Sequence, residues 1–124
     1  MLPRLWLVVG LAIWLGSTPA KAASAAEVLP ACKLYLSVLD RQGVVKDTEL
    51  AHLMDAGECL GAIYTLLNVS QILTNNFQFC PPVDADVEHG VRAVVTYIET
   101  NPDRASADFT AVALEALQAT WPCR

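Results

Sequence analysis

Four cysteines that follow an apolar N-terminal segment constrain this chain more than any other feature. Arg4 precedes the apolar run Leu5–Leu15, and Ala20-Lys21-Ala22 places small residues at the −3 and −1 positions of a cleavage site. A transmembrane helix needs about 20 apolar residues, so a membrane anchor is the weaker alternative. The pattern predicts a secretory signal peptide over residues 1–22 and a single exported domain over residues 23–124.

Export to an oxidising compartment favours disulfide bonds between the cysteines. Four cysteines can pair in three ways, and two disulfides are expected. A metal site is disfavoured, because the sequence contains no CxxC pair and neither histidine lies at zinc-like spacing from a cysteine. The sequence therefore predicts no metal and no cofactor. The cysteines concerned are Cys32, Cys59, Cys80 and Cys123.

Apolar residues recur at spacings of three and four in four segments, which is the period of an amphipathic helix. No segment alternates between apolar and polar residues long enough to predict a strand. The fold class predicted is all-α, a small four-helix domain stapled by two disulfides. Asp84 is the expected N-cap of the third helix and Ser106 that of the fourth. The helices are expected near residues 28–39, 48–73, 85–100 and 107–121, and Pro30 is placed in the first turn of the first.

The second predicted helix carries a long apolar stripe that we expect to face the core. Within it, Gly57 and Gly61 lie four residues apart on one face, which would allow another helix to approach closely. The stripe consists of Leu50, Leu53, Met54, Gly57, Leu60, Tyr64 and Leu67.

This arrangement of helices favours one pairing of the cysteines. Cys32 lies in the first helix and Cys59 in the second, so a bond between them would join an antiparallel pair. Cys80 precedes the third helix and Cys123 follows the fourth, and two antiparallel helices of similar length bring such ends together. The favoured pairs are Cys32–Cys59 and Cys80–Cys123, while the other pairings stay open.

Catalytic motifs are missing from the sequence, which contains no GxSxG, HExxH, P-loop or GxGxxG pattern. His52, Asp55 and Glu58 recur at helical spacing and could be drawn as a metal or acid–base cluster. A solvated, charged helix face is the stronger interpretation, because charged residues are mostly exposed. We therefore expect a binding protein rather than an enzyme.

The segment between the second and third predicted helices is the main candidate for a protein-binding surface. It places amide and aromatic side chains beside Cys80 and the rigid Pro81-Pro82 pair. Rigid aromatic side chains suit the centre of an interface, because they lose little entropy on binding. The predicted binding residues are Asn75, Asn76, Phe77 and Gln78. Alternatively, at least one of Phe77 and Phe79 closes the end of the helix bundle.

Charge indicates the kind of partner. Loss of Arg4 and Lys21 with the signal peptide would change the formal net charge from −5 to −7. An acidic surface repels nucleic acid and anionic lipid, but it attracts a basic protein. Asp84 and Asp86 follow the binding segment and are predicted to form an acidic rim that steers such a partner.

Several motifs in combination resemble the Rap/Tai family, small periplasmic immunity proteins of type VI secretion systems. They are Cys59-Leu60-Gly61 within a helix, Phe79-Cys80-Pro81-Pro82, the Val94–Pro102 segment and the terminal Trp121-Pro122-Cys123. The resemblance covers nearly the whole mature domain. It implies an all-α, disulfide-bonded fold in the periplasm and a partner that is a peptidoglycan amidase delivered by a neighbouring cell.

Three functions are compatible with these observations. The leading hypothesis is an immunity protein that binds and inhibits a type VI secretion amidase effector, a task that needs no catalytic residues. The alternatives are a small helical chaperone that responds to envelope stress or acid, and an adaptor without a toxin partner. A homodimer is compatible with each of them.

Overall fold

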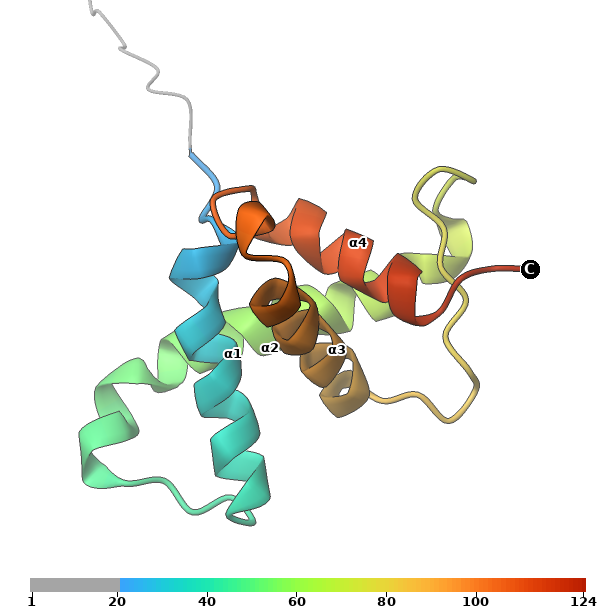
Figure 1. Cartoon of the computed structure of the whole chain (residues 1–124). Coiled ribbons are helices and arrows are strands. Elements are labelled where there is room, and N and C mark those ends of the chain that lie inside the picture. The colour runs from blue at the N-terminus through green and yellow to red at the C-terminus, as the bar shows by residue number, and fades with distance from the viewer. Residues whose placement is uncertain (1–20) are drawn as a thin grey trace, which may run out of the picture.

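The computed structural model describes residues 21–124, which form an all-α domain (Figure 1). The predicted signal peptide, apart from Lys21 and Ala22, lies outside the described residues. Short 3₁₀ helices separate the four α-helices, and the described residues contain no strand beyond an isolated bridge between Ser24 and Asp108. The elements are α1 (Ala25–Asp40), η1 (Asp47–His52), α2 (Leu53–Val69), η2 (Ser70–Ile72), α3 (Val87–Thr100), η3 (Pro102–Arg104) and α4 (Phe109–Thr120).

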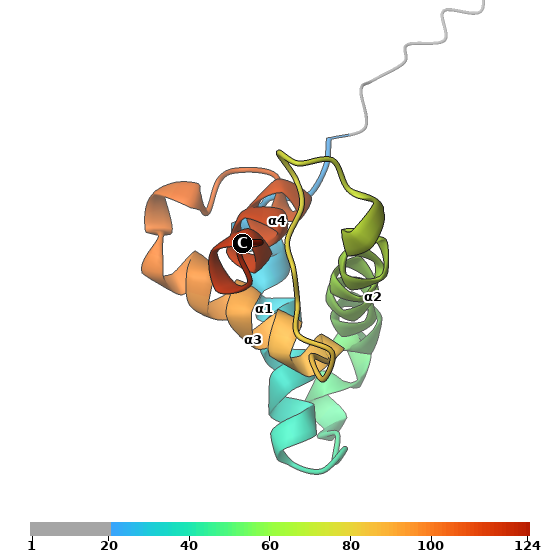
Figure 2. The same cartoon turned by 90° about the vertical axis from the view of Figure 1, so that its right-hand side faces the viewer.

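The helices cross one another around one core. Figures 1 and 2 show α2 passing across α1 and α3, with α4 packed against α3 on the other side. Each of the four α-helices contacts the other three, so all of them contribute to the same core. The core consists of Ala25, Val28, Cys32, Leu36, Cys59, Ile63, Phe79, Val91, Val94, Val95, Ile98, Phe109, Val112, Ala113, Ala116 and Leu117.

Two disulfides staple this arrangement, and both predicted pairs are confirmed. Cys32–Cys59 joins α1 to α2 inside the core, where both cysteines are fully buried. Cys80–Cys123 joins the segment before α3 to the segment after α4, and both of these cysteines are exposed. The first bond therefore belongs to the interior and the second to the surface.

The start of α1 is fixed against the start of α4. Ser24 caps α1 in a capping box with Glu27, in which each side chain binds the backbone of the other residue. The backbone N–H of Ala25 donates to Ala107 O (2.9 Å), and that of Phe109 donates to Ala23 O (2.9 Å). These bonds satisfy donors that a helix start leaves unpaired, and they hold the two ends of the domain together.

Three details of the helix starts differ from the prediction. Asp86, not Asp84, caps α3, because the residues before it form a turn in which the Ala85 N–H donates to Pro82 O (3.0 Å). Asp108, not Ser106, caps α4, for the same reason: an Arg104–Ala107 turn comes first. Pro30 lies inside α1 rather than in its first turn, since the helix begins at Ala25.

The predicted core face of the second helix was wrong. Most of the predicted stripe faces solvent, and its Met54 and Tyr64 side chains are 85% and 59% exposed, whereas its last residue, Leu67, packs against the core. The buried residues of α2 are Ala56, Cys59 and Ile63, on a neighbouring face of the helix. Gly57 and Gly61 meet no neighbouring atom within 4 Å of an added Cβ, so no helix approaches them. The Cys32–Cys59 disulfide turns the face of α2 that carries Cys59 toward α1.

Candidate protein-binding surfaces

The predicted binding segment forms a loop that α4 holds in place. A turn between Thr74 and Phe77 shapes its tip, with the Phe77 N–H donating to Thr74 O (2.8 Å). The side-chain amide of Gln118 donates to Asn76 O (2.9 Å) and more weakly to Gln78 O (3.4 Å). The Cys80–Cys123 disulfide closes the base of the loop.

The two phenylalanines of this loop have different surroundings. Phe79 is 1% exposed and belongs to the core, whereas Phe77 is 53% exposed. One of them therefore closes the end of the bundle, as the alternative interpretation required, and the other stays available to a partner. Asn75 and Asn76 are also exposed, while Gln78 is half-buried. The loop thus presents one aromatic side chain on a fixed backbone.

The acidic rim is separated from this loop. Asp84 and Asp86 lie at the far end of the extended segment that leads from Phe79 to α3, and Figures 1 and 2 show this end well away from the loop tip. Asp86 accepts a hydrogen bond from the His89 N–H (2.9 Å), which lowers the pKa of its carboxyl group. Asp86 is thus a helix cap that also carries a negative charge, and the structure does not place it beside Phe77.

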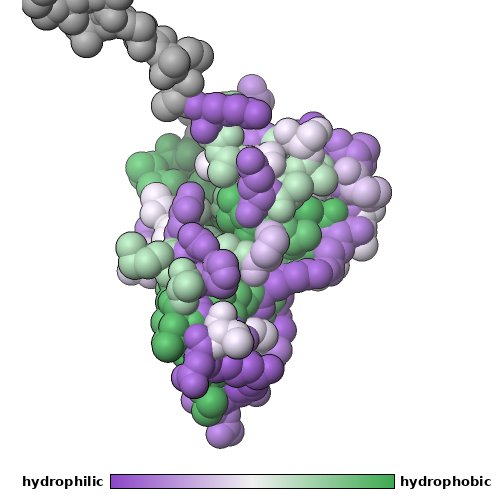
Figure 3. Space-filling model, turned by 90° about the vertical axis from the view of Figure 1, so that its left-hand side faces the viewer, coloured by the Kyte–Doolittle hydropathy of each residue, from purple (hydrophilic) through white to green (hydrophobic). Residues whose placement is uncertain are grey.

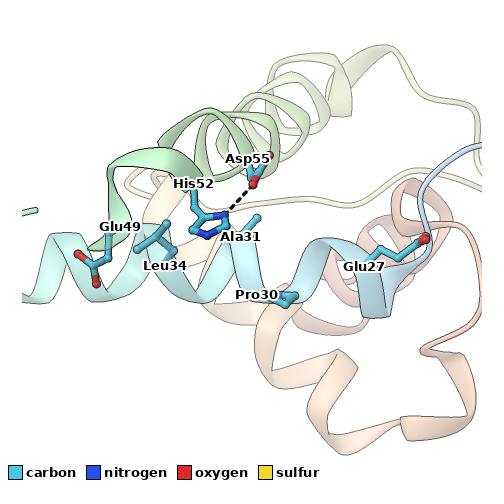
Figure 4. Close-up of a pocket in the computed structure, with 7 residues that line it drawn as sticks. All are labelled: Glu27, Pro30, Ala31, Leu34, Glu49, His52 and Asp55. Atoms are coloured by element: carbon cyan, nitrogen blue, oxygen red, sulfur yellow. Dashed lines mark hydrogen bonds and ion pairs between the residues drawn. The ribbon is translucent and has the colours of Figure 1, made fainter. Parts of the chain in front are cut away.

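A second surface lies between α1 and α2, where sequence reasoning had assigned a solvated face. Figure 4 shows a groove whose floor comes from α1 and whose wall comes from η1 and the start of α2. Its volume is about 320 Å³. His52 and Asp55 interact across 3.3 Å between Nδ1 and Oδ2. The lining residues are Glu27, Pro30, Ala31, Leu34, Glu49, His52 and Asp55.

Hydrogen bonds favour the ionised form of two carboxyl groups in this groove, Glu27 and Glu49. Ser24 donates from its backbone N–H (2.7 Å) and its hydroxyl (2.9 Å) to Oε2 of Glu27, which lowers the pKa of Glu27. Arg41 donates to both oxygens of Glu49 (2.9 and 2.7 Å) and lowers its pKa in the same way. Hydrogen bonds to the charged form favour that form, so both groups are carboxylates at neutral pH.

Most cations of the domain are already engaged. Arg92 pairs with Asp40 (2.6 Å) and Glu88 (2.8 Å), Arg104 pairs with Glu115 (2.5 Å), and Lys33 pairs with Glu99. Figure 3 shows that hydrophobic patches alternate with hydrophilic ridges on the side that carries α1 and η1. The surface left for a partner is therefore acidic and partly apolar.

The structure offers no metal centre or membrane span in its described part. Among residues 21–124, no three His, Cys, Asp or Glu side chains come together in a way that could hold a metal ion. None of the helices formed by these residues has the length and apolar character needed to cross a bilayer. The cluster formed by His52, Asp55 and Glu58 is reduced to one His52–Asp55 contact.

Comparison with known families decides the assignment. The model for Rap1a immunity proteins matches residues 24–123, which include all four α-helices and both disulfides. The chain belongs to the Rap1a immunity protein family. As a member, it is an immunity protein, whose partner is a secreted effector protein. No curated protein and no solved structure matched the chain.

Two features of these surfaces escaped sequence reasoning. Gln118 lies in the last turn of α4, and nothing local in the sequence indicates that it binds a loop some forty residues earlier. The groove was also missed, although one of its carboxylates was predictable, because Ser24 and Glu27 have the spacing of a capping box. The rest of the groove depends on how α1 and α2 cross.

Proposed function

We propose that this Rap1a family member is a periplasmic immunity protein that binds a peptidoglycan amidase delivered by a type VI secretion system and blocks its active-site groove. The match of the family model to residues 24–123 carries the proposal, because it spans the whole helical domain. The two disulfides support an oxidising compartment.

Inhibition by occlusion needs a rigid projection rather than catalytic groups. The loop at residues 74–78 meets this requirement, since it projects an exposed Phe77 from a backbone that Gln118 and a disulfide restrain. A pre-ordered loop loses little conformational entropy when it binds. We assign Asn75, Asn76, Phe77 and Gln78 to the contact with the amidase, with Phe77 as its aromatic anchor.

Charge supports a basic partner surface. Asp84 and Asp86 are exposed and lie on a different part of the surface from the loop, so they would act on the approach of the amidase rather than in the centre of the interface. Such charges raise the association rate at low salt and have little effect on the dissociation rate.

The test uses the predicted mature chain, residues 23–124, and a peptidoglycan amidase effector whose gene neighbours the gene of this protein. We expect the two proteins to form a stable complex in calorimetry and the amidase to lose its activity on purified peptidoglycan at an equimolar ratio. An amidase from an unrelated secretion system serves as the control and should stay active. Full hydrolysis in the presence of excess immunity protein, with no complex detected, would refute the amidase assignment.

A further inference from the structure

We propose that the groove between α1 and α2 is a second contact site for the effector and that it takes an arginine side chain from a basic segment of that protein. The inference rests on the proposed function, and it adds a contact that is separate from the loop around Phe77. It follows from the shape of the groove, its charge and the surface around it.

The floor of the groove suits the aliphatic part of a long side chain. Pro30, Ala31 and Leu34 of α1 form an apolar strip, and Figure 4 shows the His52 ring beside it. A volume of about 320 Å³ has room for one extended side chain. Arginine side chains commonly bury their methylene groups on apolar surface while the charged end stays near water or carboxylates.

The carboxylates that line the groove suit a guanidinium group. Both hydrogen bonds from Ser24 end on Oε2 of Glu27, and the contact from His52 ends on Oδ2 of Asp55. One oxygen of each carboxylate is thus without a donor among the described residues. Glu49 differs, because Arg41 already binds both of its oxygens. A planar guanidinium can donate two bonds to a carboxylate, which a lysine ammonium cannot match in geometry.

Charge complementarity selects a basic partner for this site. Of the three carboxylates that line the groove, Glu49 is paired with Arg41, whereas Glu27 and Asp55 form no ion pair with a lysine or arginine within the described part of the chain. The segment beside it carries four of the eight large hydrophobic side chains that are exposed in residues 21–124, namely Val44, Leu50, Leu53 and Met54. Apolar area next to unneutralised carboxylates fits a basic, amphipathic segment. It does not fit a second copy, which would bring the same negative charges together.

The first experiment titrates ¹⁵N-labelled mature protein with N-acetyl-arginine amide and, as a matched neutral probe, N-acetyl-citrulline amide. We expect the arginine compound to shift the backbone amides of Ala31, Leu34 and Asp55. The citrulline compound, which keeps the shape and loses the charge, should bind about fivefold more weakly, the upper range for an exposed ion pair. Equal binding of the two probes, or shifts confined to other surfaces, would overturn the proposal.

Two variants distinguish binding in this groove from a non-specific attraction of arginine to the negative charge of the whole protein. Asp55→Asn removes a groove charge and should weaken arginine binding about fivefold, whereas Asp103→Asn removes an exposed charge in η3, outside the lining of the groove, and should leave it unchanged. Self-association that Asp55→Asn abolishes would show that a second copy covers the groove, and this result would also overturn the proposal.

Calorimetry with the amidase then links the groove to the effector. Asp55→Asn should raise the dissociation constant about fivefold, while the Asp103→Asn control should match the wild type. A complex that forms equally well with Asp55→Asn would refute the groove and leave the proposed function intact. Conversely, binding of N-acetyl-arginine amide without any amidase complex would keep the groove as an arginine site but refute the amidase as its source.

Discussion

Gly90 of α3 lies directly against Ile63 of α2: a Cβ added at Gly90 would come within 2.7 Å of the Ile63 Cγ2 atom. Both residues are buried, and the contact lies where α3 packs against α2. Leu67 and Leu117 approach the same point at 3.4 and 3.8 Å. Three helices are thus packed together at a position where no side chain fits.

Alanine substitutions at Gly90, which is tightly packed, and at Gly61, which has open space around it, should have opposite effects on stability. Gly90→Ala should destabilise the domain by about 1–3 kcal/mol, the usual cost of overpacking a core. Gly61→Ala should instead stabilise it by about 0.5–1 kcal/mol, because Gly61 lies in an exposed helix with open space around it. Urea unfolding of both variants is the measurement. A stabilised Gly90→Ala protein would show that α2 and α3 are less tightly packed than the structure indicates.

The two disulfides should differ in how easily they are reduced. Cys32 and Cys59 are fully buried, whereas Cys80 and Cys123 are exposed. A mild thiol reductant should therefore open Cys80–Cys123 first, as alkylation and mass spectrometry of the native protein would show. The Cys80→Ala/Cys123→Ala variant should lose about 4 kcal/mol of stability on the chain-entropy model, without a free thiol to complicate the result.

Packing between α3 and α4 should contribute strongly to the free energy of unfolding of the domain. Val94→Ala and Leu117→Ala should each cost about 1–4 kcal/mol, because both side chains are fully buried. Thr96→Ala, at an exposed position of the same helix as Val94, is the matched control and should cost less than about 0.5 kcal/mol. Similar losses for Val94→Ala and Thr96→Ala in urea titrations would contradict the orientation of α3.

Recognition of the effector should depend on Phe77. Phe77→Ala should weaken binding by about 2 kcal/mol or more in calorimetry, as expected for an aromatic anchor. Ile72→Ala removes a hydrophobic side chain that is even more exposed and lies just before the loop, so it should have little effect. If a folded Asn76→Ala/Phe77→Ala variant keeps full affinity, the loop is not the interface. Asp84→Asn should mainly slow association at low salt.

Acid should weaken the fold through the helix caps. The pKa values of Glu27, Glu49 and Asp86 lie below their ordinary values, chiefly because of hydrogen bonds from Ser24, Arg41 and His89 respectively. A carboxyl group whose pKa is lower in the folded state stabilises the fold above its unfolded pKa and stops doing so as the pH falls through the folded value. Stability should thus be steady down to about pH 5 and decline below that. Glu27→Gln should show a smaller decline.

Much of the fold could be predicted, because helical periodicity, the prolines and the cysteines all favour the same four-helix, disulfide-bonded arrangement. The helix starts were harder, since Asp84 and Asp86 are equally good caps in isolation. The backbone turn from Pro82 to Ala85 decides between them. That turn depends on where α3 docks, which local sequence does not reveal.

The buried face of α2 could have been predicted from the position of Cys59. Counting apolar residues favoured the face with Met54 and Tyr64, which proved to be exposed. The predicted disulfide already required Cys59 to face α1, and Ala56 and Ile63 lie three and four residues from it on the same side. In a disulfide-bonded helix, the cysteine is thus a better guide to the buried face than the most hydrophobic stripe.

The pairing of the first turn of α1 with the start of α4 constrains the order in which this protein can be assembled. Ala23 and Ala25 take their hydrogen-bond partners from Phe109 and Ala107, near the other end of the chain. A polypeptide that emerges from a translocation pore with its N-terminus first would leave α1 without these partners until almost the whole sequence had passed. The packing of α1 against α4 would then be completed only at the end of transport.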